Sequence, residues 1–153
     1  MARHVATISW RRDEGSDFLS NEYSRVHSWR FDGGAVVAAS PSPDIVPAPH
    51  SDPANVDPEE AFVASLSSCH MLFYLHKARE AGFVVDSYDD EAVGKLAPGP
   101  TGKLMMTKVT LNPRATYSGA PPTREEEEHI HHQAHEECFI ANSVTTQVVT
   151  NLD

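Results

Sequence analysis

The residues with the clearest capacity for chemistry are the two cysteines of the chain, Cys69 and Cys138, which stand 69 positions apart. A disulfide needs two Cα atoms within about 7 Å, and this spacing alone does not bring the thiols together. If they meet, one thiol can be oxidised to a sulfenic acid, and the other can condense with it to a disulfide. Two buried thiols without a function are the simpler interpretation. The pair is therefore a candidate redox centre whose existence depends on the fold.

Cys69 falls in the apolar middle of a helix predicted over residues 58–81. In mid-helix a thiol is out of reach of the helix dipole, and apolar surroundings raise its pKa. A reactive Cys69 thus requires a nearby cation, most simply an arginine that a carboxylate orients. Glu59, in the first turn of the same helix, lies about 15 Å away along the axis. The alternative interpretation of Glu59 is an ordinary first-turn carboxylate that complements the helix dipole.

A second predicted helix, from residue 123 to about 138, carries a cluster of histidines. His131 and His135 are four positions apart and Cys138 follows three positions later, so the three side chains share one helix face and form a candidate metal site. No fourth ligand of familiar spacing completes the set. Glu128, His132 and Glu136 fit an ordinary solvated face equally well.

Capping residues predict where both helices begin, and a glycine predicts where the first one ends. Asp57 caps the first helix and Glu60, three positions later, completes a capping-box pattern. Thr123 and Glu126 repeat this pattern in the second helix, and Gly82 is a natural stop for the first. The middle of the first helix is apolar on nearly every side, which predicts a buried helix.

The remaining chain predicts strands that surround the two helices. A tight turn at 32–34 joins two strand-like segments as a hairpin, and six prolines make 40–58 a long loop. Strands are predicted over 4–10, 23–31, 35–39, from 83 to as far as 96, 104–111 and 143–149. This order predicts an α+β fold in which an antiparallel sheet packs on a long buried central helix and a second helix.

Composition limits the classes of partner. A chain of 153 residues is expected to form one domain over 1–153. The net charge of −10 argues against nucleic acid or an anionic membrane as a partner. No apolar segment approaches the roughly 20 residues of a membrane span, and the N-terminus does not resemble a signal peptide. We therefore expect a cytoplasmic protein whose thiols start out reduced.

Two segments resemble a known family. Residues 57–61 (DPEEA) followed by 64–71 (ASLSSCHM) resemble the first-helix motif of the OsmC/Ohr family, the osmotically inducible protein C and organic hydroperoxide resistance proteins. Residues 134–144 (AHEECFIANSV) resemble its second-cysteine motif. The order of predicted elements also matches, so the resemblance covers most of the chain. Phe139 follows Cys138 where the family often has proline, which places the chain outside the best-studied branches.

The resemblance implies an intertwined α+β homodimer that reduces organic hydroperoxides with thiols and needs no metal or organic cofactor. By position, Cys69 corresponds to the attacking cysteine and Cys138 to the resolving one. Glu59 corresponds to the carboxylate that orients the activating arginine. For that arginine Arg25 is our choice and Arg30 the second candidate, since both lie before the first helix.

The mechanism expected from these residues is a two-cysteine cycle. Cys69, activated by Arg25, attacks the peroxide and becomes a sulfenic acid, Cys138 condenses with it, and an external dithiol reduces the disulfide. Apolar neighbours of Cys69 would favour an organic peroxide over hydrogen peroxide. The alternative is a non-catalytic redox-sensing or small-ligand-binding protein on the same fold, in which the thiol pair reacts once without turnover.

Overall fold

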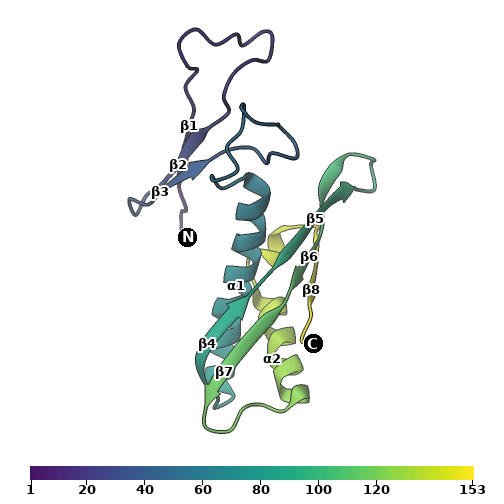
Figure 1. Cartoon of the computed structure of the whole chain (residues 1–153). Coiled ribbons are helices and arrows are strands. Elements are labelled where there is room, and N and C mark those ends of the chain that lie inside the picture. Colours follow the sequence, from purple (N-terminus) through teal and green to yellow (C-terminus); the bar gives the residue numbers. More distant parts are fainter. The chain divides into compact units, whose positions relative to one another are not determined.

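The computed structural model describes all residues from Met1 to Asp153 and confirms the α+β class (Figure 1). Two helices and eight strands follow one another along the chain, with a short 3-10 helix before the last strand. The elements are β1 (Ala6–Ser9), β2 (His27–Phe31), β3 (Val36–Ala39), α1 (Pro58–Glu80), β4 (Val84–Asp90), β5 (Val93–Pro98), β6 (Leu104–Leu111), β7 (Pro113–Ser118), α2 (Arg124–Glu137), η1 (Ala141–Ser143) and β8 (Gln147–Thr150). Neither helix combines the length and the apolar character that a membrane span requires.

The chain divides into two compact units, residues 1–61 and residues 62–153. The expectation of a single domain over 1–153 stays a prediction. In the first unit, β1, β2 and β3 form an antiparallel sheet. The predicted hairpin is confirmed: Trp29 pairs with Val37, and Gly34 in the turn adopts a φ of +94°, a backbone conformation that glycine adopts without a steric penalty.

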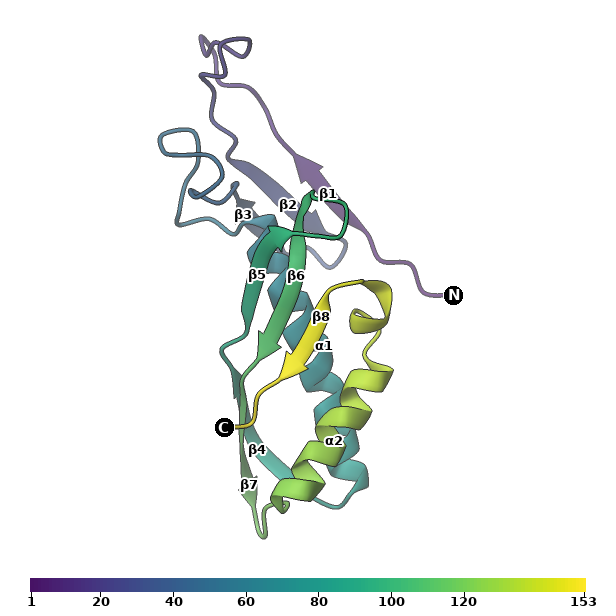
Figure 2. The same ribbon diagram turned by 90° about the vertical axis from the view of Figure 1, so that its right-hand side faces the viewer.

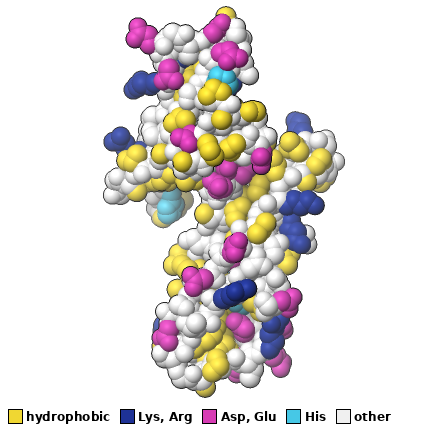
Figure 3. Space-filling view, in the orientation of Figure 1, with side chains coloured by type: hydrophobic (Ala, Val, Ile, Leu, Met, Phe, Trp, Pro, Cys, Tyr) yellow, Lys and Arg dark blue, Asp and Glu magenta, His cyan; other side chains and the backbone are white.

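Much of the apolar surface of the first unit is open to solvent. Figure 3 shows hydrophobic side chains spread over its visible face. The large exposed ones are Met1, Val5, Ile8, Trp10, Phe18, Leu19, Val26, Phe31, Val36 and Ile45. The loop 40–58 returns to the sheet, where Ser40 and Val56 form a backbone hydrogen bond of 3.0 Å.

The ends of α1 form as predicted. The Glu60 backbone N–H donates to Asp57 Oδ1 at 2.7 Å, and the Asp57 backbone N–H donates to Glu60 Oε2 at 3.1 Å, which completes a capping box. Gly82, with a φ of +88°, follows the helix and stops it.

Within one chain, α1 is buried along one side. Its fully buried residues recur at every fourth position, at Leu66, His70, Tyr74 and Ala78, and so form one stripe. Leu72 lies off this stripe and is 60% exposed. The apolar character of the middle of α1 therefore exceeds what the core of one chain covers.

The second unit contains two small sheets, β4–β7 and β5–β6–β8. The prediction of a continuous strand from 83 toward 96 is wrong, because pairing changes partner in between: Asp90 pairs with Pro113 on β7, whereas Val93 pairs with Thr110 on β6. Asp90 Oδ1 accepts the Asn112 backbone N–H at 2.6 Å at this junction.

The C-terminal strand also differs from its prediction. Residues 143–146 are not a strand, since η1 ends at Ser143 and β8 begins only at Gln147. β8 runs parallel to β6, whereas the other pairs of named strands are antiparallel.

Both helices cover the same face of the strands in the second unit (Figure 2). Thr123 and Glu126 form the predicted capping box at the start of α2. One core cluster joins the helices to β4 and β7 through Tyr74, Ala78, Ile130 and Ala134. A second cluster joins the first half of α1 to β6 through Leu66, Val109 and Leu111. The consequence for the site is that α1 and the end of α2 are packed together.

Candidate functional site

The structure brings the two thiols together. Cys69 lies in the middle of α1 and is half-buried, and Cys138 caps the C-terminus of α2 and is only 1% exposed. The Cys69 thiol is a near neighbour of the Cys138 thiol and raises its pKa, and both cysteines are free. The pair spans 69 positions of sequence and is assembled by the packing of the two helices.

Cys138 has the surroundings of a protonated thiol. Burial, and then the neighbouring Cys69 thiol, raise the pKa of Cys138 to about 11, against the partial opposing effect of the backbone N–H of Ala141. That N–H donates to Cys138 Sγ at 3.4 Å. At neutral pH Cys138 is therefore a thiol and not a thiolate, so it is a poor first nucleophile.

The residues that follow the two cysteines also meet. Phe73 lies one turn after Cys69, and Phe139 directly follows Cys138. Their rings contact edge to face, with centroids 5.0 Å apart and an interplanar angle of 86°. Phe139 is nonetheless 72% exposed. An aromatic pair thus borders the thiols on one side.

Arg25 belongs to the first unit, where its guanidinium is held by local groups. Nη1 donates to the carbonyl oxygens of Tyr23 at 2.6 Å and Asn21 at 3.3 Å, and Nη2 donates to the Asn21 side chain. The guanidinium carbon also lies 3.8 Å from the centroid of the Tyr23 ring, a cation–π contact. Asn21 has a positive φ of 66°, so a strained turn supports this arrangement.

Arg25 lines an apolar cavity of about 520 Å³ in the first unit. The other residues lining it are mainly aromatic or aliphatic: Ile8, Trp10, Phe18, Tyr23, His27, Pro41 and Pro58. Phe18 and Tyr23 stack with centroids 4.5 Å apart, and Trp10 packs against both. A cation at the edge of an apolar cavity can hold the polar end of a molecule whose body is apolar.

The structure does not pair Arg25 with Glu59. Glu59 is half-buried in the first turn of α1, and none of the ion pairs includes Glu59, Arg25 or Arg30. Arg30 is exposed in β2. Both arginines and Glu59 lie in the first unit, and both cysteines lie in the second.

The histidines do not form the metal cluster considered from the sequence. No group of three His, Cys, Asp or Glu side chains is placed to hold a metal ion. Instead His131 turns into the core, where its Nδ1 lies 2.9 Å from Nε2 of His70 on α1. The two rings are parallel within 5°, and Tyr74 stacks on His131 at 4.1 Å.

This buried histidine pair is electrically neutral at pH 7. Burial, and then the charge of His135, lower the pKa of His70 to about 4, with Asp90 acting weakly in the opposite direction. Burial, and then His70, lower the pKa of His131 to about 3. His70 was not among the predicted site residues, although its place in the series Leu66, His70, Tyr74, Ala78 marks it as a core position.

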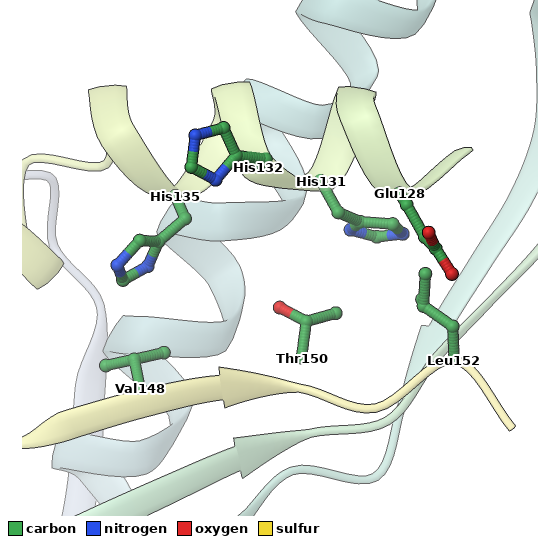
Figure 4. Close-up of a pocket in the computed structure, with 7 residues that line it drawn as sticks. All are labelled: Glu128, His131, His132, His135, Val148, Thr150 and Leu152. Atoms are coloured by element: carbon green, nitrogen blue, oxygen red, sulfur yellow. The ribbon is translucent and has the colours of Figure 1, made fainter. Parts of the chain in front are cut away.

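The other histidines of α2 lie beside a second cavity, of about 240 Å³, between α2 and the C-terminal segment (Figure 4). In Figure 4, His132 and His135 project from α2, and Val148, Thr150 and Leu152 lie on the opposite side. The cavity is lined by Glu128, His131, His132, His135, Val148, Thr150 and Leu152. Its only carboxylate, that of Glu128, is already paired with Arg124 at 2.7 Å.

The fold and the site together define an α+β protein whose two free cysteines are brought together from its two helices. The OsmC-like protein family model matches residues 50–153, and the chain belongs to this family. The resemblance noted in the sequence is thus confirmed.

Solved structures extend this comparison over the whole chain. An OsmC-like protein of unknown function from Vibrio cholerae is 52% identical, with a TM-score of 0.97 and complete coverage of both chains. An organic hydroperoxide resistance protein OsmC from Legionella pneumophila is 16% identical, with a TM-score of 0.69 over 99% of this chain and 96% of that one. The organic hydroperoxide resistance protein OhrB of Bacillus subtilis is 19% identical, with a TM-score of 0.65 over 97% and 98%. The latter two share the fold. No curated protein matches the chain significantly.

Proposed function

We propose that the protein is a thiol-dependent peroxidase that reduces organic hydroperoxides with Cys69 and Cys138. The observation that carries this proposal is that the two thiols are neighbours between α1 and the end of α2. Membership of the OsmC-like family supports it, as does the fold shared with two organic hydroperoxide resistance proteins.

The cycle has three steps. The Cys69 thiolate attacks the distal peroxide oxygen, the O–O bond breaks, and the alkoxide takes a proton and leaves as an alcohol, so that Cys69 becomes a sulfenic acid. The Cys138 sulfur then attacks the sulfenic sulfur, and water leaves as the disulfide forms. An external dithiol returns both residues to thiols by exchange. The high pKa of Cys138 fits the second role, since it leaves Cys69 as the first nucleophile.

Arg25 is our candidate for the group that activates Cys69 and polarises the peroxide, and Glu59 for the carboxylate that orients Arg25. The apolar cavity beside Arg25 supports an organic substrate, because it offers apolar surface to the body of the peroxide and a cation to its polar end. We further propose that the protein works as a homodimer in the cytoplasm, where thiols are kept reduced.

The test is the consumption of cumene hydroperoxide and hydrogen peroxide by the reduced protein in the presence of a dithiol. We expect many turnovers per chain with cumene hydroperoxide, fewer with hydrogen peroxide, and none in Cys69→Ser. Cys138→Ser should still form the sulfenic acid but no intramolecular disulfide. Consumption of about one peroxide per thiol pair would contradict the proposal and favour a redox-sensing protein.

The arginine is tested separately. Arg25→Met should lower kcat/KM on the order of 100-fold, the size of effect seen when one stabilising donor is removed from a transition state. Arg30→Met is the matched control, since Arg30 is exposed on β2, and it should keep wild-type activity. Glu59→Gln should reduce activity less than Arg25→Met does. A larger loss of activity in Arg30→Met than in Arg25→Met would assign the activation of Cys69 to Arg30.

A further inference from the structure

Three consecutive residues at the end of α2 contact three residues of one stripe of α1. Cys69, Phe73 and Lys77 are spaced by four positions and so lie above one another on the helix. Their partners are Cys138, Phe139 and Glu137. We call this set of three contacts the thiol seam.

The residues directly before and after Cys138 in the chain are each held by a residue of α1. Glu137 Oε1 accepts Lys77 Nζ at 2.7 Å on the preceding side. The Phe139 ring packs edge to face on Phe73 on the following side. Lys77 is only 14% exposed, so this ion pair is partly shielded from water.

Cys138 needs such support because the helix ends at this residue. Its ψ of 112° is extended, and its last helical bond runs from its backbone N–H to the His135 carbonyl oxygen at 3.3 Å. Beyond it the chain turns into η1, and the Ser143 hydroxyl donates to the Phe139 carbonyl oxygen at 2.6 Å. The regular ladder of α2 therefore does not by itself fix where the Cys138 thiol points.

We propose that Phe139, through Phe73, and Glu137, through Lys77, are positioning residues that hold Cys138 against Cys69 for disulfide closure. The step is the attack of the Cys138 sulfur on the Cys69 sulfenic acid, in which the S–S bond forms and water leaves. The oxidant is the organic hydroperoxide that produced the sulfenic acid. This inference takes its oxidant from the proposed peroxidase function, whereas the contacts that position Cys138 come from the structure.

The exposure of Phe139 supports a positioning role over a role in the core. A ring that is 72% exposed contributes little buried area to stability. Its removal should therefore leave the fold intact while it loosens the chain next to Cys138. An edge-to-face aromatic pair fixes orientation as well as distance, which is what closure of a disulfide demands, because its geometry is narrow.

The experiment separates the two chemical steps by rapid mixing of the reduced protein with cumene hydroperoxide. Oxidation of Cys69 is followed by trapping of the sulfenic acid, and closure by loss of trappable sulfenic acid. Phe139→Ala should slow closure about tenfold and leave Cys69 oxidation unchanged. Glu137→Gln should slow closure about threefold, because the pair is partly exposed.

Matched controls lie beside the seam. Leu72→Ala removes a neighbouring exposed apolar side chain of α1 without touching the seam, and Glu136→Gln removes the charge next to Glu137. Both should close at the wild-type rate. Phe139→Tyr, which keeps the ring, should restore closure. Equal closure in Phe139→Ala and wild type would overturn the proposal, as would equal slowing in Leu72→Ala.

A peroxide-free measurement separates this inference from the proposed function. The equilibrium between reduced protein and oxidised dithiothreitol reports the tendency of the two thiols to form a disulfide. An equilibrium constant for disulfide formation about tenfold larger in wild type than in Phe139→Ala would support the positioning role of Phe139. This result would hold even if the protein consumed no peroxide. Absence of a Cys69–Cys138 disulfide in wild type would overturn it.

Discussion

At the scale of the residue, the two cysteines are distinguished by their surroundings. Cys69 is half-buried on α1, whereas Cys138 is enclosed at the end of α2. Burial is the largest cause of the raised pKa of Cys138, since low polarity disfavours the thiolate. This difference, and not the sequence spacing, separates the roles of attacking and resolving thiol in the proposed cycle.

The raised pKa of Cys138 predicts how its reactivity depends on pH. In Cys69→Ser, the rate of iodoacetamide modification of Cys138 should still be rising at pH 9, because burial, the largest cause of its raised pKa, remains in this variant. The same variant unfolded in guanidinium should level off near the ordinary thiol pKa of about 8.5. A folded-state plateau below pH 9 would show that Cys138 is not enclosed as the structure describes.

At the scale of the element, α1 and α2 are joined by a polar contact inside an apolar interface. The His70–His131 pair is buried, with exposed fractions of 1% and 3%, and His70 Nδ1 has no hydrogen-bond partner. Protonation of either ring would place a charge in this interface. The packing that brings Cys69 to Cys138 therefore depends on two neutral imidazoles.

This pair predicts loss of stability in mild acid. Both folded-state pKa values lie below the unfolded value of about 6.5, so the unfolded state binds protons first as the pH falls. The stabilisation is complete above pH 6.5 and declines toward about pH 4, by ~1.4 kcal/mol per pH unit for each histidine that remains neutral in the fold. Urea unfolding at pH 7, 6 and 5 measures this slope.

The control for the histidine pair replaces both rings together. His70→Leu/His131→Leu removes both polar partners, which leaves no unpaired imidazole in the core. Its stability should depend less on pH between 6.5 and 5 than that of wild type. If the two slopes were equal, other groups would be responsible for the acid sensitivity.

At the scale of the whole molecule, the thiol pair connects elements that are distant in sequence within the unit 62–153. The segment from Cys69 to Cys138 is a loop of about 70 residues, which contains β4 to β7 and all of α2. A disulfide there would restrict most of this unit in its unfolded state. Oxidation is therefore expected to be visible in the stability of the protein as well as in its chemistry.

The oxidised protein should resist unfolding more than the reduced one. Closure of a loop of about 70 residues stabilises by about 4 kcal/mol in the chain-entropy model. Denaturant unfolding of the full chain, carried out with and without a dithiol, measures this difference in the free energy of unfolding. Cys69→Ser should show the reduced value under both conditions, and an oxidised wild type no more stable than this variant would contradict Cys69–Cys138 pairing.

Local chemistry was enough to predict much of this molecule. Both capping boxes, the hairpin at 32–34, the break at Gly82 and the α+β class follow from side chains that act on their own backbone within a few residues. The two motifs that contain the cysteines identified the family for the same reason, since they are contiguous. Effects that act between residues close in sequence can be predicted from the sequence alone.

Features that depend on contacts between residues distant in sequence were determined only by the tertiary structure. Three features depend on which partner lies opposite: the proximity of Cys69 to Cys138, the pairing of His131 with His70, and the division of the predicted strand at 91–92. The apolar middle of α1 predicted burial, yet only packing determined which stripe is covered. By itself the sequence determined the helix ends, the class of fold and the family; the placement of the thiols came from the docking of α2 on α1, because that arrangement is set by the sum of many weak contacts.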